Sequence, residues 1–207
     1  MIRVAEEVLA AQRKGRGVVA LETTLVAHGF PGDEGVEVAL GSERAVRDGG
    51  SVPATIGVLD GSIVVGLTED ELARFDASAR KLGPRDIAAA VVQRVVGATT
   101  AGGTLAVCNA VGIQFMGTGG LGGGLLLARA PDESLDDVEP LIADALARAE
   151  AEGVHGQAVT PFVLAYLHRE SGGRTLRANR ELVIGNARLA GEVAAVQISP
   201  MVDEIAT

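Results

Sequence analysis

The stretch VVALETTLVAHGF, residues 18–30, most constrains the fold, because its apolar run stops abruptly at an acid and two hydroxyl residues. A short apolar run preceded by glycine predicts a strand buried on both faces of a sheet over residues 18–21. Glu22 then stands at the end of the strand, where a cleft would raise its pKa and suit it to give or take a proton. The alternative is an ordinary strand end, with Glu22 solvated or paired and Thr23 and Thr24 capping a helix.

Composition narrows both the fold class and the partners. Of the 207 residues 47% are hydrophobic but only 2% are aromatic, so the core must consist mainly of small aliphatic side chains. Such a core is typical of helices packed closely on a mostly parallel sheet, and the length predicts a single domain over residues 1–207. A net charge of -9 argues against a nucleic-acid partner, since phosphate backbones are bound mainly by clusters of lysine and arginine.

Cysteine usage and hydropathy predict the compartment. The single cysteine, Cys108, cannot form an internal disulfide, which favours a reducing environment. No apolar run reaches the length of a membrane span, and residues 1–16 show an amphipathic helix pattern without the apolar centre of a signal peptide. We therefore expect a cytoplasmic protein with no membrane partner.

Periodicity and turn signals predict the order of elements. Residues 51–65 indicate a β-hairpin around Asp60-Gly61, and Thr68 with Glu71 forms a capping box that opens a helix. A strand is expected to enter the glycine-rich residues 112–124, with another short strand over 125–127. Helical spacing predicts further helices over residues 1–16, 36–47, 87–96, from 131–139 to about 152, 159–168 and 178–196.

Two segments could bind an anion. Residues 80–86, RKLGPRD, are the dense basic segment of an acidic chain, and Lys81 and Arg85 could meet a phosphate beside the first amides of the following helix. The alternative is a pair of solvated charges between helices. Residues 97–103, GATTAGG, could offer amides and the hydroxyls of Thr99 and Thr100, or could simply allow close helix packing. The glycines of 112–124 match neither the dinucleotide fingerprint nor a P-loop.

Taken together, these stretches resemble the pseudouridine-5'-phosphate glycosidase family. The resemblance rests on several unusual segments in the same order and spacing, so it covers nearly the whole chain. They are ALETT at 20–24 with the following His28-Gly29, SVPATI at 51–56, the basic loop at 80–86, GATT at 97–100, TGGLGG at 118–123, VTPF at 159–162, Gly172-Gly173, Ala178-Asn179 and NAR at 186–188.

The resemblance implies a three-layer α/β/α fold with a mostly parallel sheet and a helical C-terminal segment. It implies reversible cleavage of the C–C glycosidic bond of pseudouridine 5'-phosphate to uracil and ribose 5-phosphate, in a homotrimer that uses Mn²⁺. By position, Glu22 matches the proton donor, and Lys81 and Ala101 match residues that contact substrate. The local patterns add Thr23, Thr24, Thr99, Thr100 and Arg85 to the predicted substrate-binding set. We expect Glu22, the Lys81 loop, Thr99, Thr100 and Gly119-Gly120 to surround one cleft.

The chain departs from the family after its glycine loop. The family has a long central segment there, with the metal-binding aspartate and a nucleophilic lysine, whereas here residues 122–124 run directly into LLL at 125–127. The only lysines are Lys14 and Lys81. DESLD at 132–136 fits the metal stretch, but the commoner use of such an acidic cluster is to start a helix, and we predict no metal ligand. The alternative function is a non-catalytic remnant that binds a sugar phosphate or acts through an oligomer interface.

Overall fold

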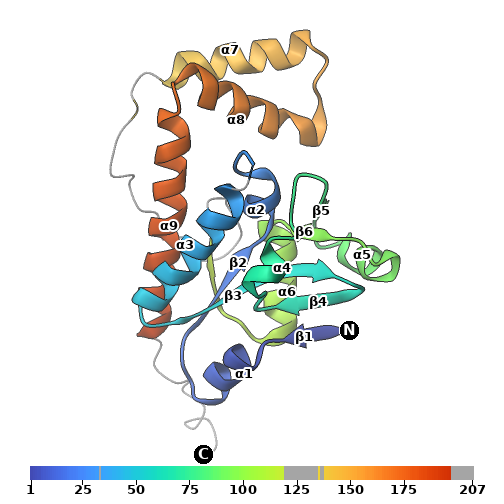
Figure 1. Cartoon of the computed structure of the whole chain (residues 1–207), viewed down its shortest axis with the longest axis vertical. Coiled ribbons are helices and arrows are strands. Elements are labelled where there is room, and N and C mark those ends of the chain that lie inside the picture. The colour runs from blue at the N-terminus through green and yellow to red at the C-terminus, as the bar shows by residue number, and fades with distance from the viewer. Residues whose placement is uncertain (33, 119–134, 136–137, 197–207) are drawn as a thin grey trace, which may run out of the picture.

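The computed structural model describes residues 1–32, 34–118, 135 and 138–196 (Figure 1). Its first half alternates short strands and helices, and its C-terminal part is helical (Figure 1). The elements are β1 (Ile2–Val4), α1 (Glu6–Arg13), β2 (Val18–Glu22), α2 (Thr24–His28), α3 (Glu34–Asp48), β3 (Val52–Leu59), β4 (Ser62–Val65), α4 (Glu69–Leu72), β5 (Arg80–Leu82), α5 (Ile87–Gln93), β6 (Gly97–Thr99), α6 (Ala101–Val111), β7 (Phe115–Gly117), α7 (Val138–Ala151), a 3-10 turn η1 (Gly156–Ala158), α8 (Val159–Glu170) and α9 (Arg174–Ala195).

The strands of the described residues form one mixed, mostly parallel sheet. The order β1-β4-β3-β2-β7 gives the main path, and β5 joins it through β6. Pairing is parallel between β1 and β4, β2 and β3, β2 and β7, and β5 and β6, and antiparallel where β3 meets β4 and β6. The predicted hairpin is confirmed, with Asp60 and Gly61 both at positive φ in the turn between β3 and β4.

Helices cover both faces of the sheet, which confirms the predicted α/β/α class. Alternate residues of β3 explain the two layers, because side chains of a strand point to opposite faces in turn. Val52, Ala54 and Ile56 pack in a cluster with α1, α5 and α6. Leu59 belongs to the opposite cluster, with residues of α2, α3 and α4. All eight residues of β3 are buried, as expected for a strand covered on both faces.

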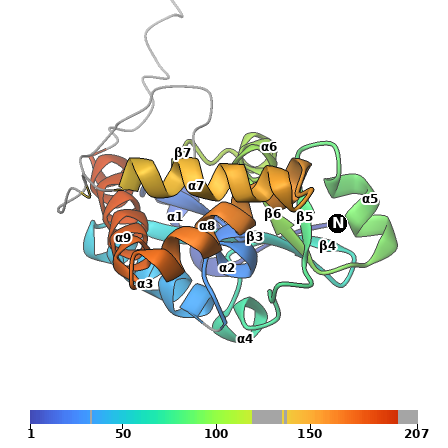
Figure 2. The ribbon, with the colours of Figure 1, turned by 90° about the horizontal axis from the view of Figure 1, so that it is seen from above.

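The C-terminal helices extend the second layer and then leave the sheet. Helix α9 lies along α3 and contacts β2 and β7, so it packs against that edge of the sheet (Figure 1). Gly191 permits this close packing, because a Cβ there would lie 2.7 Å from the backbone oxygen of Val46. Helices α7 and α8 pack on each other and project beyond α2 (Figures 1 and 2).

Two local predictions are wrong. Residues 1–16 do not form one helix, because Ile2–Val4 pairs with β4 as an edge strand before α1 begins. Arg80–Leu82 is a strand rather than a loop between helices, since it pairs with β6. Three-residue strands are set by their partners rather than by their own pattern, which is why periodicity missed them. The strand predicted over residues 125–127 lies outside the described residues.

Candidate active site at the meeting of two strand ends

The candidate site forms where β2 and β6 end head to head along the same edge of β3. Strand β2 pairs with residues 52–56 of β3, and β6 runs the opposite way beside Gly57 and Val58. The carboxyl ends of β2 and β6 therefore face each other, and α2 and α6 begin directly after them. Two helix N-termini and two strand ends meet at this point, which is a usual place for an anionic ligand in an α/β fold.

Fully buried threonines join the two strand ends. The Thr99 backbone N–H donates to Thr23 Oγ1 at 2.9 Å, and both hydroxyls donate to the carbonyl oxygen of Ile56, at 2.8 Å from Thr23 and 2.7 Å from Thr99. Thr104, on α6, donates to Thr99 Oγ1 at 2.9 Å. The structure thus places Thr23 and Thr99 beneath the site, where their hydroxyls replace the strand pairing that ends there.

Thr100 begins α6 and fixes it to β5. Its side-chain oxygen accepts from the Gly103 N–H at 3.2 Å as an N-cap, and its hydroxyl donates to the Leu82 carbonyl at 3.0 Å. Ala101 follows as the first helical residue, so its amide is one of the orphan donors of the helix start. The hydrogen bond from Thr100 to Leu82 thus places β5, which carries Lys81, beside the Ala101 amide.

Glu22 is the buried acid of the site, with only 7% of its surface exposed. The Thr118 hydroxyl donates to Glu22 Oε1 at 2.5 Å, and Asn186 on α9 donates to the Thr118 carbonyl at 3.2 Å. Burial raises the pKa of the Glu22 carboxyl, and the Thr118 hydrogen bond, the Ala101 amide and the charge of Lys81 oppose that rise. The carboxyl therefore keeps its proton to a higher pH than an exposed glutamate does.

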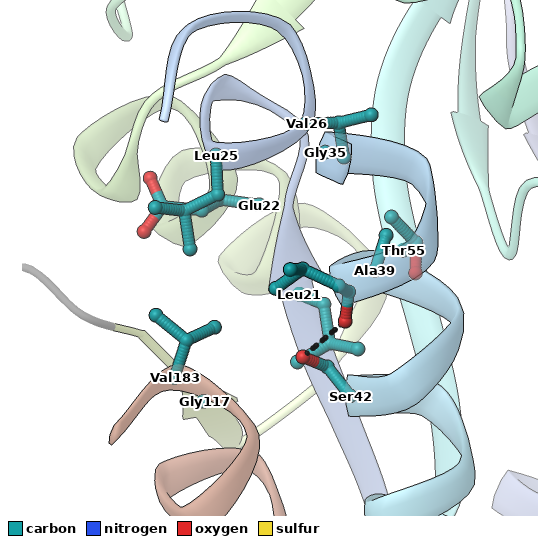
Figure 3. A pocket seen from close by; sticks show the side chains of 11 residues that line it. Leu21, Glu22, Leu25, Val26, Gly35, Ala39, Ser42, Thr55, Gly117 and Val183 are labelled. Atoms are coloured by element: carbon teal, nitrogen blue, oxygen red, sulfur yellow. Dashed lines mark hydrogen bonds between the residues drawn. The ribbon is translucent and has the colours of Figure 1, made fainter. Parts of the chain in front are cut away.

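A small apolar cavity lies on the side of α3 and is lined in part by Glu22. It has a volume of about 20 Å³, close to the space of a single water molecule. Its lining includes Leu21, Leu25, Val38 and Val183 together with Glu22. Figure 3 shows the Glu22 carboxylate pointing away from the Ser42 and Thr55 side of this cavity. The backbone end of the side chain is thus enclosed by aliphatic groups, while the carboxyl turns toward Thr118.

Lys81 supplies the positive charge of the site. It lies half-buried on β5 opposite Ala98, and its charge acts on both Glu22 and His28. Within the described part of the chain Lys81 forms no ion pair. Its ammonium group is therefore available to an anionic ligand. Lys81 is thus close enough to Glu22 for its charge to act on the carboxyl, and the Ala101 amide donates to that carboxyl, whereas the single cleft expected around these residues and the substrate-binding roles given to them stay predictions.

His28 is a site residue that the sequence reasoning missed. It ends α2, one helical turn after Thr24, and Thr24 Oγ1 lies 3.5 Å from its Nδ1. Burial lowers the pKa of His28, and the charge of Lys81 lowers it further. The spacing of Thr24 and His28 on one face of a helix was the available signal, although scattered histidines are usually structural.

Other predicted residues take more distant or undescribed positions. Arg85 is exposed in the turn between β5 and α5, and it makes no hydrogen bond or ion pair with any residue of the described ranges. Gly119-Gly120 lies outside the described residues. So does all of the acidic stretch at 132–136 except Leu135.

The described residues do not fit a Mn²⁺ site. Among them, no three His, Cys, Asp or Glu side chains come together closely enough to hold a metal ion. The partners of Glu22 are a hydroxyl, an amide and an ammonium group, whereas Mn²⁺ prefers several oxygen ligands.

No helix within the described ranges is long and apolar enough to cross a membrane.

Comparisons with known proteins agree on one family. The family model described as indigoidine synthase A like protein matches residues 7–136 and 124–196, in two pieces that overlap at 124–136, where the sequence departs from the family pattern. A pseudouridine-5'-phosphate glycosidase from Chloroflexus aurantiacus is 33% identical over 305 aligned positions, covering 97% of this chain and 100% of the relative. One from Salinispora tropica is 31% identical, covering 93% and 91%. Because the first alignment is much longer than the 207 residues of the chain, a long stretch of that relative has no counterpart here.

Solved structures give the same answer. The prealnumycin C-glycosynthase AlnA, in complex with ribulose 5-phosphate, matches with a TM-score of 0.78 and 28% identity, covering 94% of this chain and 96% of that one. An indigoidine synthase A-like protein from Thermotoga maritima matches with a TM-score of 0.71 and 25% identity over the same shares. The chain therefore belongs to the indigoidine synthase A-like family, together with enzymes that are named pseudouridine-5'-phosphate glycosidases.

Proposed function

We propose that this chain binds pseudouridine 5'-phosphate, or its product ribose 5-phosphate, between Glu22 and Lys81, with Glu22 as the proton donor for cleavage of the C–C glycosidic bond. The observation that carries the proposal is the buried Glu22 carboxyl within reach of the charge of Lys81, which forms no ion pair with another described residue. The names of the relatives and the ribulose 5-phosphate bound to AlnA support a phosphorylated sugar as the ligand class.

The residues divide the work between charge and proton transfer. Lys81 and the N-terminal end of α6 attract the phosphate, because an ammonium group and the positive end of a helix dipole both favour an anion. Breaking the bond between the ribose C1' and the uracil C5 leaves an electron pair on C5 that must receive a proton. Glu22, in which the raised pKa favours the protonated carboxyl, supplies that proton, while the ribose C1' takes a hydroxyl group from water and the remaining water proton restores the Glu22 carboxyl.

The small number of lysines bears on the rate of C–C bond cleavage. The chain has two, and Lys14 is exposed at the end of α1, before β2 begins, whereas Glu22 closes the same strand. Lys14 therefore lies at the opposite end of the sheet. One amine at the site cannot hold the phosphate and form an imine with the ribose aldehyde at the same time. We propose that Lys81 holds the phosphate and that turnover is slow. The position of Lys14 away from the site favours a non-catalytic sugar-phosphate binder as the second candidate.

Two measurements test these functions together. Uracil release is followed at saturating pseudouridine 5'-phosphate, and calorimetry measures ribose 5-phosphate binding. We expect binding that is lost in Lys81→Met and kept in Lys14→Met, with slow release that stops in Glu22→Gln. Binding without any release selects the second candidate. Absence of binding, or fast release that survives in Lys81→Met, contradicts the proposal.

Borohydride trapping tests the role of Lys81 directly. Reduction in the presence of ribose 5-phosphate fixes an imine as a secondary amine, which mass spectrometry locates by peptide. We expect no trapped sugar on Lys81, and a trapped adduct there would show that it is the nucleophile instead. We further propose that the protein acts in the cytoplasm as a homotrimer. Dependence on Mn²⁺ remains a prediction of the family resemblance.

A further inference from the structure

Helix α9 reaches the Glu22 carboxyl through Thr118. Leu21 on β2 pairs with Gly117 on β7, and the next residues along these parallel strands are Glu22 and Thr118. The Thr118 hydroxyl donates to Glu22 Oε1 at 2.5 Å, a short distance that is typical of a carboxylate acceptor. The pairing of β7 with β2 ends at Gly117, and the Thr118 carbonyl beyond it accepts from Asn186 Nδ2 at 3.2 Å. Asn186 is therefore bonded to the residue that is bonded to the buried acid.

The packing of α9 fixes the position of Asn186. Val183 and Ala187 lie on one face of α9 and are only 5% and 1% exposed, and Asn186 is half-buried at the edge of that face. A Cβ on Gly117 would lie 3.2 Å from the Ala187 Cα, so β7 and α9 are in close contact beside Thr118. Asparagine is a weaker helix former than leucine, which would also suit such a half-buried position. The hydrogen bond to Thr118 thus explains an amide that helix formation and apolar packing do not.

Three polar groups of the described residues oppose the effect of burial on Glu22. Burial raises the pKa of Glu22, whereas the Thr118 hydrogen bond, the Ala101 amide on α6 and the charge of Lys81 on β5 lower it. The remaining elements around the Glu22 side chain present apolar groups, which are Leu25 from α2, Val38 from α3 and Val183 from α9. The Ala101 amide is fixed within a helix and Lys81 lies on a paired strand, whereas Thr118 stands just beyond the end of β7. The direction of its hydroxyl therefore depends on what holds its backbone.

We propose that Asn186 is a positioning residue, which holds the Thr118 backbone so that the Thr118 hydroxyl points at Glu22, and which thereby sets the pH range in which Glu22 keeps its proton. This inference rests on the proposed function, in which Glu22 gives that proton to the uracil C5. Donation of the proton leaves a carboxylate, and a hydroxyl donor binds a carboxylate more strongly than a neutral carboxyl. The Thr118 hydrogen bond therefore strengthens as the proton leaves, which favours the transition state over the ground state.

A titration of the Glu22 carboxyl tests the inference without requiring turnover. Isotopic labelling of the glutamate carboxyl carbons allows an NMR titration, and comparison with Glu22→Gln identifies the Glu22 signal. We expect the Glu22 pKa to rise in Asn186→Leu and in Asn186→Ala, because the Thr118 hydroxyl is no longer aimed at the carboxylate. Thr118→Val removes the hydroxyl and should raise this pKa at least as far. Thr118→Ser keeps the hydroxyl and should titrate close to the natural chain.

Uracil release gives a second readout, and Asn109→Leu is the matched control. Asn109 is exposed on α6, so the same change of side chain there should alter neither the titration nor the rate. We expect both Asn186 variants to lower the maximal rate of uracil release by up to about tenfold, the factor for one hydrogen bond to a charged group. The alkaline limb of the rate profile should move to higher pH, and ribose 5-phosphate binding should stay unchanged.

The titration keeps this inference distinguishable from the proposed function. A Glu22 titration that is unchanged in both Asn186 variants, or in Thr118→Val, overturns the inference even where uracil is released. An equal rise in Asn109→Leu overturns it too, since the effect would then not be local. A rise confined to the Asn186 and Thr118→Val variants, without uracil release from any protein, supports the positioning role and contradicts the proposed cleavage. If Asn186→Leu does not fold, Asn186→Ala decides the result, because alanine favours a helix and adds no bulk.

Discussion

At the scale of single residues, the site depends on the carboxyl group of Glu22. Folding buries this group although burial of an ionised carboxylate costs free energy. A glutamate whose pKa is raised on folding stabilises the protein least when it is ionised. Burial raises the pKa of Glu22, so its unfavourable contribution is absent below the ordinary glutamate pKa and grows as the pH rises through the folded value. Glutamine removes the charge and keeps the shape. We expect Glu22→Gln to raise the melting temperature at pH 8 and to leave it unchanged at pH 4.

Glu43 provides the control for this prediction. It is a second half-buried carboxyl whose pKa burial raises, and Thr55 donates to it at 2.5 Å, away from Lys81 and α6. Glu43→Gln should show the same dependence of the melting temperature on pH without changing uracil release. If Glu22→Gln loses stability equally at pH 4 and pH 8, the carboxyl acts through its hydrogen bond and not through its raised pKa.

Lys81 links Glu22 to His28 by charge, and this link can be measured. The ammonium group lowers the pKa of His28 and also lowers that of Glu22 against the effect of burial. Lys81→Met removes both influences, so both pKa values should rise. The measurement is an NMR titration of the His28 ring protons. Lys14→Met, which removes a charge at the other end of the sheet, should leave the titration where it is, and an equal shift in both variants would contradict the link.

At the scale of elements, the close approach of α6 to β5 holds the site together. A Cβ on Gly103 would lie 2.5 Å from the Leu82 carbonyl oxygen, beside Lys81, whereas one on Gly102 would make an ordinary contact with Pro84 at 3.5 Å. Gly103→Ala should therefore destabilise the fold by about 1–3 kcal/mol and weaken ribose 5-phosphate binding. Gly102→Ala should be neutral or stabilising by up to about 1 kcal/mol, since alanine favours a helix. Denaturant unfolding compares the two, and equal effects would show that α6 is not tightly held.

Local signals explain which elements the sequence could predict. The Thr68 side chain accepts from the Glu71 N–H while the Glu71 carboxylate accepts from the Thr68 N–H, as the capping box requires. The Asp60-Gly61 turn forms for a similarly local reason, its need for two positive φ angles. In contrast, β1 and β5 have three residues each and take their conformation from β4 and β6. No pattern within three residues can specify such a partner.

The site shows the same division between local and distant causes. Glu22 at a strand end follows from its local pattern, and its neighbourhood with Lys81 and Ala101 was expected from the family resemblance. The buried hydrogen bond between Thr23 and Thr99 could not be predicted. It depends on β2 and β6 approaching each other from opposite directions along the same edge of β3. His28 was missed for a related reason, since Lys81 reaches it only through the pairing of β5 with β6.

At the scale of the whole molecule, the two segments that match the family model pack around one sheet. Helix α9, which the family model matches in its second piece, covers β2 and β7 and carries Asn186 to Thr118. Thr118, which donates to the buried Glu22 carboxyl, is thus itself bonded to a residue of the second piece. This arrangement explains how a chain that lacks a long stretch of its relatives can still build the described site.

The proposed homotrimer requires an apolar surface that a second copy covers. A groove of about 520 Å³ runs between the N-terminal strand and helices α5 and α6, and Val92 and Met1 in it are 82% and 90% exposed. Exposed apolar side chains gathered in one groove favour association. Light scattering at micromolar concentration should show an oligomer for the natural chain and a smaller species for Val92→Glu. The reason is that burial of an unpaired carboxylate in an interface costs free energy. Leu146→Glu, at an exposed position on α7, should leave the assembly intact, and a natural chain that stays monomeric would contradict the proposal.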